Sequence, residues 1–167
     1  MTSSILDMSR ILDLLASQSR RPRYTFMVLN LISEAADASG KVGPYVVQGD
    51  QPLPVRDWLC DALATMAQRD PRRRRLEAEV MSQLESMLPT DEQLALPLIR
   101  NAVRERIRAS NRPNISRAVS DLVRTGLLKR HYQGWRTDHH NRGAGRQAVY
   151  TVHQEALAAL RRRSQLF

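Results

Sequence analysis

The sequence predicts a mainly α-helical fold with one small β-hairpin near its C-terminal end. Through most of the chain, apolar residues recur at intervals of three and four, which is the period of an amphipathic helix. Two short β-branched and aromatic segments, 127–132 and 147–152, enclose a stretch rich in glycine and arginine, as in a hairpin. The length of 167 residues suits one domain with extensions. We therefore expect a helical N-terminal region, 1–97, and a C-terminal functional unit, 98–167.

Two helices are expected in the first forty residues. Residues 4–7 fit a capping box, in which a serine hydroxyl and an acid three residues later satisfy free N–H groups at a helix start. This predicts a first amphipathic helix, Ser4–Leu15. A basic break at 20–23 precedes a second helix at about 24–38, and Gly40 is expected to end it.

Two more helices are expected before residue 90. Residues 40–54 contain three glycines and three prolines, so they are predicted to form a loop with at most a short strand. Pro54 then opens a third helix through about Arg69. Asp70-Pro71 is a favourable N-cap and first-turn pair, which predicts a fourth helix through about Leu88.

The region before the hairpin is expected to contain a broken helix and a tight turn. Residues 90–93 form another capping box, and the helix that follows should be kinked or divided by Pro97. Residues 110–113 are predicted to form a turn. Asn114 can then cap a further helix that ends at Gly126.

Positive charge is concentrated in the C-terminal two-fifths of the chain. Residues 100–167 contain fifteen basic and four acidic side chains, whereas residues 1–99 contain eleven basic and thirteen acidic ones. Localised positive charge favours a polyanion partner, because each neutralised phosphate releases condensed counterions. Nucleic acid is therefore the first class of partner to consider.

The composition also excludes several classes of protein. Cys60 is the only cysteine, so neither an internal disulfide framework nor a multi-cysteine zinc site is expected. No apolar run approaches the roughly 20 residues that a membrane-spanning helix needs. Acids within the apolar part of the N-terminus argue against a signal peptide. We expect a cytoplasmic protein, associated with the nucleoid and not with a membrane.

A family resemblance is carried by two segments, Asn-Ile-Ser-Arg-Ala-Val-Ser-Asp-Leu-Val-Arg-Thr-Gly-Leu-Leu-Lys-Arg at 114–130 and Gly-Arg-Gln-Ala-Val-Tyr-Thr-Val at 145–152. With the preceding helix and turn, residues 98–152 resemble the winged helix-turn-helix DNA-binding domain of bacterial transcription regulators. In that family a recognition helix of the form S-x-x-V-x-x-L-x-x-x-G-L-[LI]-x-R precedes a Gly/Arg wing. The matching residues are Ser116, Val119, Leu122, Gly126, Leu127, Leu128 and Arg130. The resemblance implies a mainly α fold with a small β-hairpin wing and additional N-terminal helices.

The sequence also departs from a minimal winged helix. The first helix, first strand and second helix of that fold are not contiguous here. If 24–38 is the first helix and 45–47 the first strand, then residues 54–89 form a two-helix insertion.

The amphipathic pattern of the last predicted helix agrees with a DNA-reading role. Its apolar residues Ile115, Ala118, Val119, Leu122 and Val123 share one face. The other face carries short polar side chains and arginines, which suit close approach to base edges and phosphates in a major groove. The candidate groove contacts are Asn114, Ser116, Arg117, Ser120 and Arg124. An ordinary surface helix explains this helix alone equally well, and the flanking hairpin favours DNA.

Further basic residues are candidates for contacts to the DNA backbone. In the predicted wing these are Arg136, Arg142 and Arg146, and the alternative interpretation of this segment is a solvated loop. The candidate phosphate contacts are Arg104, Arg108, Arg112 and Lys129. His139 and His140 beside Asp138 are not expected to bind metal, because adjacent histidines on a loop do not define a coordination geometry.

These observations predict sequence-specific binding of double-stranded DNA by a homodimeric transcription regulator without a cofactor. A dimer is expected because one recognition helix reads few bases. Its surfaces would be Ser4–Leu15 and Gln154–Arg163, although each could instead cover its own core. No catalytic constellation is discernible, so an enzyme is not expected. The alternatives are a replication, partition or RNA-associated module without promoter recognition, and a protein-interaction adaptor.

Overall fold

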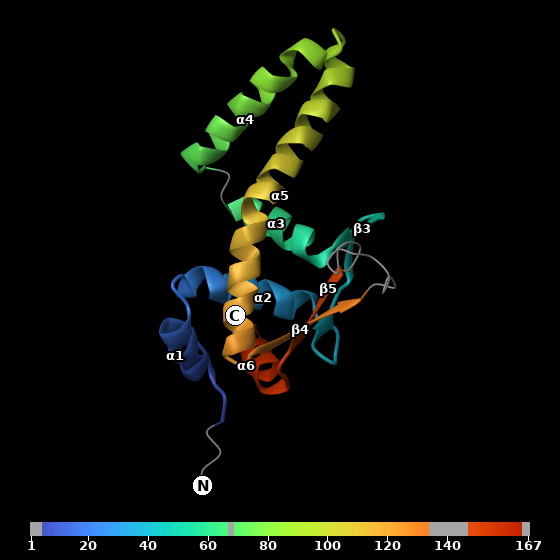
Figure 1. The fold of residues 1–167 in the computed structure, drawn as a ribbon. Coiled ribbons are helices and arrows are strands. Elements are labelled where there is room, and N and C mark those ends of the chain that lie inside the picture. The colour runs from blue at the N-terminus through green and yellow to red at the C-terminus, as the bar shows by residue number, and fades with distance from the viewer. Residues whose placement is uncertain (1–4, 67–68, 134–146, 165–167) are drawn as a thin grey trace, which may run out of the picture. The chain divides into compact units, whose positions relative to one another are not determined.

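The computed structural model describes residues 5–66, 69–133 and 147–164, and within them the protein is mainly helical, with two small antiparallel sheets (Figure 1). The chain divides into two compact units, at different points from the expected boundary after residue 97. Unit 1 comprises Met1–Leu59 and Ile115–Phe167, and unit 2 comprises Cys60–Asn114. Among the described helices, none combines the length and the apolar character that crossing a membrane requires.

Unit 1 begins with two helices that bury their apolar sides within the chain. Helix α1 (Met8–Gln18) starts after Asp7, whose Oδ1 accepts the Arg10 N–H at 2.8 Å. The helix therefore begins later than the expected Ser4, which lies outside the described residues. Ile11 and Leu15 are fully buried, and α1 packs on α2 (Pro22–Ala35) and on α6 (Gln154–Ser164).

The segment expected to be a loop contains three short strands, β1 (Lys41–Val42), β2 (Tyr45–Gln48) and β3 (Gln51–Pro54). Strands β2 and β3 pair as a hairpin of their own, whereas β1 joins the C-terminal sheet. Gly40 makes this possible. Its φ is +85°, and a Cβ there would lie 2.7 Å from the Val152 carbonyl oxygen. Only glycine allows such a close approach of two backbones.

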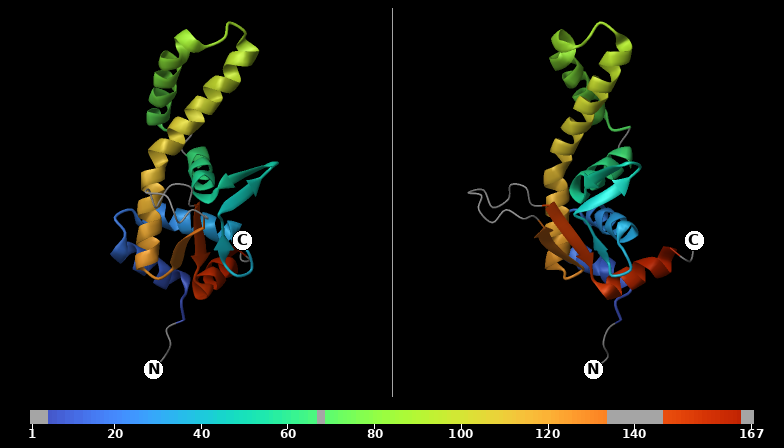
Figure 2. Two further views of the ribbon diagram at one scale, coloured as in Figure 1. Left: turned by 45° about the vertical axis from the view of Figure 1, so that its right-hand side comes forward. Right: turned by 90° about the vertical axis from the view of Figure 1, so that its right-hand side faces the viewer.

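The predicted hairpin and last helix are confirmed. Strands β4 (Leu128–Gln133) and β5 (Gln147–Val152) are antiparallel, with Leu128 opposite Val152, and β1 completes the sheet order β1–β5–β4. Helix α2 packs on β5, and α6 packs on α1 and α2 (Figure 2). The buried apolar residues of α6 are Ala156, Leu157, Ala159 and Leu160. The apolar face of α6 and the residues Ile11 and Leu15 of α1 are therefore used in the core of unit 1, whereas Leu12 is 48% exposed.

Unit 2 consists of the end of α3 (Val55–Met66), α4 (Pro71–Leu84), a 3₁₀ turn η1 (Glu85–Met87) and the first part of α5 (Glu92–Arg124). The predicted cap of α4 is confirmed, because the Asp70 carboxylate accepts the Arg72 N–H at 2.9 Å. Asp91 Oδ1 similarly accepts the Gln93 N–H at 3.0 Å at the start of α5.

Helix α5 differs from the broken helix and turn that the sequence predicts between residues 90 and 114. It runs without interruption from Glu92 to Arg124 and contains both Pro97 and Pro113, so a division of the helix at Pro97, the turn at 110–113 and the cap at Asn114 are wrong. Each proline removes one backbone donor, which a long helix tolerates when neighbouring turns are held. Ion pairs of Glu105 with Arg108 and Arg112 link successive turns ahead of Pro113. The predicted recognition segment therefore has no N-terminus of its own.

Candidate nucleic-acid interface

The last ten residues of α5 belong to unit 1 and are anchored by one apolar side. Ile115, Ala118, Val119 and Leu122 are at most 2% exposed, at the spacing of one helix face. The predicted buried side is thus correct except for Val123, which is 37% exposed. These contacts fix which side of the helix faces outward.

The outward side carries the polar residues that the sequence singled out. Arg117 and Arg124 are exposed, and Ser116, Ser120 and Asp121 are half-buried. Residues 117, 120 and 124 follow one stripe along the helix, because intervals of three and four residues return to the same side. Arg124 forms an ion pair with Asp121, which holds its guanidinium along the helix.

Strand β4 adds a second basic element beside this helix. Arg130 Nη1 lies 3.4 Å from Ser120 Oγ, a long hydrogen bond that connects β4 to α5. Its guanidinium lies 6.0 Å from the centre of the Tyr132 ring. Lys129, the next residue towards α5 in the chain, is exposed on the opposite face of the strand. Arg130 therefore extends the basic surface from the helix onto the strand, whereas Lys129 lies on the other face.

We call this set of side chains the α5–β4 surface. It consists of Ser116, Arg117, Ser120, Asp121, Arg124 and Arg130. The sequence prediction included all of them except Asp121 and Arg130. Arg130 is part of the quoted motif, and strand alternation places it on the same face as the buried Leu128. That alternation was the signal that could have identified Arg130 as a neighbour of the helix.

Four other predicted site residues lie in unit 2, namely Arg104, Arg108, Arg112 and Asn114. Arg104 is exposed. The side chain of Arg108 is only 11% exposed, and Asp61 holds it through two hydrogen bonds, from Nε at 2.8 Å and from Nη2 at 2.6 Å.

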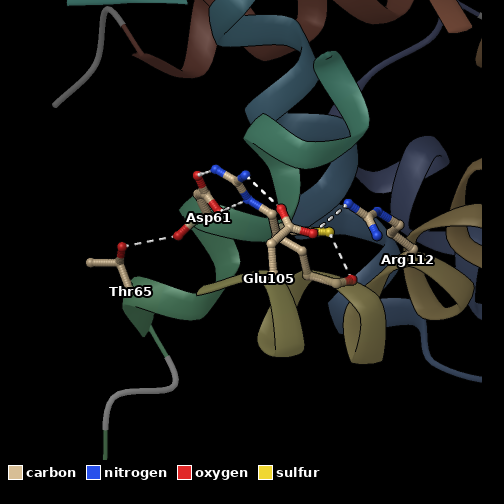
Figure 3. A network of polar contacts seen from close by, with 6 residues as sticks. Asp61, Thr65, Glu105 and Arg112 are labelled. Carbon is tan, nitrogen blue, oxygen red and sulfur yellow. Dashed lines mark hydrogen bonds and ion pairs between the residues drawn. The ribbon is translucent and has the colours of Figure 1, made fainter. Parts of the chain in front are cut away.

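The Arg108 contact belongs to a network that also includes Glu105 and Arg112 (Figure 3). Glu105 lies 3.1 Å from Arg108 and 3.5 Å from Arg112. Two carboxylates thus neutralise the two guanidiniums. This placement gives Arg108 a structural role within unit 2.

The three arginines expected in the wing, Arg136, Arg142 and Arg146, lie outside the described residues, as do His139 and His140. The described part of the hairpin ends at the pair Gln133–Gln147. In residues 5–66, 69–133 and 147–164, no three His, Cys, Asp or Glu side chains are grouped so as to hold a metal ion.

Comparisons of the chain with protein-family models, with curated proteins and with solved structures find no match. Function is therefore argued from the residues and their arrangement. Unit 1 presents an anchored helix with exposed arginines and short hydroxyl side chains beside a basic strand. Such a surface can contact phosphates and donate hydrogen bonds to acceptors on base edges.

Proposed function

We propose that the protein binds double-stranded DNA in a sequence-specific manner through the α5–β4 surface and acts as a transcription regulator. The observation that carries the proposal is the side of α5 at 116–124, where short hydroxyls alternate with exposed arginines over a buried apolar face. A major groove about 12 Å wide admits one α-helix. Ser116 and Ser120 allow close approach, and Arg117 reaches guanine acceptors or phosphates.

The arrangement of unit 1 supports the proposal. Apart from α1, the hairpin β2–β3 and α6, its chain order is α2, β1, the start of α3, the end of α5, β4 and β5, with the sheet order β1–β5–β4. This order agrees with the winged helix that residues 114–130 and 145–152 resemble. Strand β1 takes the place of the first strand, which we had expected at 45–47.

The continuous helix α5 changes how DNA would be read. A recognition helix commonly uses its N-terminal residues at the base edges. Here the corresponding segment, residues 114–124, is the C-terminal part of the 33-residue helix α5 and is preceded by several helical turns. We therefore propose that the side of the helix contacts the groove, with Arg117 and Ser120 at bases, and that Arg124 and Arg130 contact phosphates.

The test is selection of purified protein against a pool of random-sequence duplexes at two salt concentrations, followed by sequencing of the bound fraction. We expect enrichment of one short motif, lost in the variant Arg117→Ala with Ser120→Ala. Arg10→Ala is the matched control, because Arg10 is also exposed in unit 1 but lies on α1. This control should retain the motif.

The salt dependence separates the roles of the basic residues. Each phosphate contact adds about 0.9 to the logarithmic salt slope, so Arg124→Ala should lower the slope by about this amount without changing the motif. Equal binding to unrelated duplexes, or preference for RNA, would support a replication or RNA-associated module instead. Absence of binding at low salt would overturn the nucleic-acid proposal and leave the adaptor.

A further inference from the structure

Large apolar side chains are exposed where α4 is connected to α5 in unit 2. Met81 and Met87 are 51% and 70% exposed, and Leu94, Leu96 and Leu98 are 61%, 42% and 50% exposed. The first two lie on α4 and η1, and the leucines lie on the first two turns of α5. Leu94 and Leu98 lie four residues apart on one side of α5, whereas Leu96 lies on another side, so we call Leu94 and Leu98 the hairpin patch. Single exposed apolar residues are normal, but a gathered set marks an interaction surface.

The two helices bury little between them. On α4 and on α5 up to Asn114, only Val80 and Ala95 are buried apolar residues, at 5% and 9% exposure. Short helices in water depend on the packing of an apolar side for most of their stability. The hairpin patch is therefore apolar surface that the fold of this chain leaves uncovered.

Charge is separated along the same pair of helices. Residues 76–99, which contain the patch, carry five acidic and no basic side chains. Residues 69–75, at the opposite end of α4, carry five arginines and one acid. Residues 100–114, which continue α5 away from the patch, also carry five arginines and one acid. The pair of helices thus has one acidic and apolar end and one basic end.

We propose that the hairpin patch is a self-association surface on which a second copy of this chain pairs in antiparallel orientation about a two-fold axis. In a two-fold interface each copy contributes the same surface. Antiparallel pairing places the acidic end of each copy against the basic end of the other, whereas parallel or end-to-end pairing places five acids against five acids. Opposite potentials favour encounter, and facing like charges disfavour it. Leu94 and Leu98 then lie in the shared apolar centre.

Two observations favour a second copy as the partner. The charge pattern is complementary to itself, as described above. The apolar residues of α6, and Ile11 and Leu15 of α1, are buried in the core of unit 1 and so are not free to form a dimer. This inference goes beyond DNA binding and is tested without DNA, so it stands or fails separately from the proposed function.

The first experiment measures association of the full-length protein by sedimentation equilibrium over a range of concentrations. We expect a dimer whose Kd rises about tenfold or more in Leu94→Gln with Leu98→Gln, because apolar surface is removed without adding charge. Leu12→Gln is the matched control, since Leu12 is 48% exposed on α1, outside the patch. It should associate like the wild type.

Circular dichroism and thermal unfolding establish that each variant is folded, since the substituted leucines are already half-exposed. A wild-type chain that stays monomeric over the whole range would overturn the proposal. So would a double variant that dimerises as well as the wild type.

The second experiment tests the orientation. Glu79 and Glu85 are exposed at the acidic end, and Arg100 and Arg104 are exposed on the basic part of α5. Neutralising either pair with glutamine should weaken an antiparallel dimer, and so should added salt, because each removes attraction. Stronger association of either neutralised variant would show that like charges face each other and would exclude the antiparallel arrangement.

Discussion

Units 1 and 2 differ in how they use their apolar residues. Among the described residues, twenty-five apolar side chains are buried, twenty-one in unit 1 and four in unit 2. Of the twelve large apolar side chains that are exposed in the same part of the chain, six nevertheless lie in unit 2, which has about half as many residues as unit 1. Unit 1 thus has a core that can hold the α5–β4 surface in place, whereas unit 2 leaves much of its apolar surface exposed.

Helix α5 shows the same contrast within one element. Leu122, in its unit 1 part, is fully buried, whereas Leu98, in its unit 2 part, is 50% exposed. Both are leucines in a continuous helix, so helix propensity does not distinguish them. The difference comes from what surrounds the helix, and it makes Leu122 part of the core and leaves Leu98 in contact with solvent.

The largest effect is expected from Leu122→Ala. It should lower the free energy of unfolding by about 2–5 kcal/mol, because a fully buried leucine leaves a cavity. Leu98→Ala, the same substitution in the same helix, should cost less than about 1 kcal/mol when the protein is dilute enough to be monomeric. Urea denaturation of both variants measures the two values. Equal losses of unfolding free energy in the two variants would show that the two leucines contribute equally to stability, contrary to the difference between the units.

A smaller effect is expected from Asp61→Asn in unit 2. The Arg108 guanidinium is 11% exposed, and loss of its charged partner should cost about 1–3 kcal/mol. Faster amide hydrogen exchange in the middle of α5 would report the loss.

The control for that variant is Glu77→Gln, which breaks the more exposed pair Arg73–Glu77. A surface pair of this kind contributes about 0–1 kcal/mol. If both substitutions have the same effect, the Asp61–Arg108 contact does not hold unit 2 together.

The smallest effect is a pH dependence in unit 1. The Asp37 carboxylate accepts hydrogen bonds from Ser39 Oγ at 2.6 Å and from the Ser39 and Lys41 N–H groups at 2.9 and 3.0 Å. The Ser39 hydroxyl, followed by the Lys41 N–H, lowers the pKa of this carboxyl group. Its stabilising contribution is therefore present above the unfolded pKa of about 3.9 and is lost as the pH falls through the lower, folded pKa.

Thermal unfolding at a series of pH values tests this contribution. Wild type should unfold at a higher temperature than Asp37→Asn at pH 7, and the gap should narrow as the pH falls below about 4. Ser39→Ala removes the main cause of the pKa shift. In a protein that carries Ser39→Ala, the further substitution Asp37→Asn should therefore lower the unfolding temperature by less than it does in the wild type. If the difference in unfolding temperature between wild type and Asp37→Asn does not change with pH, the ionised Asp37 carboxylate is not the source of the stabilisation.

Much of the fold follows from local sequence signals. The cap at Asp70, the strands β4 and β5, and helix α6 all lie where short patterns predicted them. The buried side of 115–122 was also predicted from spacing alone. The exposed candidates Arg117 and Arg124 follow from the same spacing, because a helix that buries one side exposes the other.

The remaining features could not be read from local patterns. Asparagine, arginine and proline at 111–113 are typical turn residues, yet they continue a helix. Residues 41–42 look like part of a loop, yet they pair with β5, more than a hundred residues later. Arg108 looks like an exposed phosphate ligand until Asp61 is placed beside it.

By itself, the sequence determined the helical class, the start of α4, the C-terminal hairpin and the buried side of the last turns of α5. These depend on side chains and backbone groups within about four residues of each other, or on one short hairpin. Tertiary structure alone decided that α5 is continuous, that β1 joins the sheet, and which basic and apolar side chains stay exposed. Those outcomes depend on partners far along the chain, such as Asp61 and Arg108, 47 residues apart.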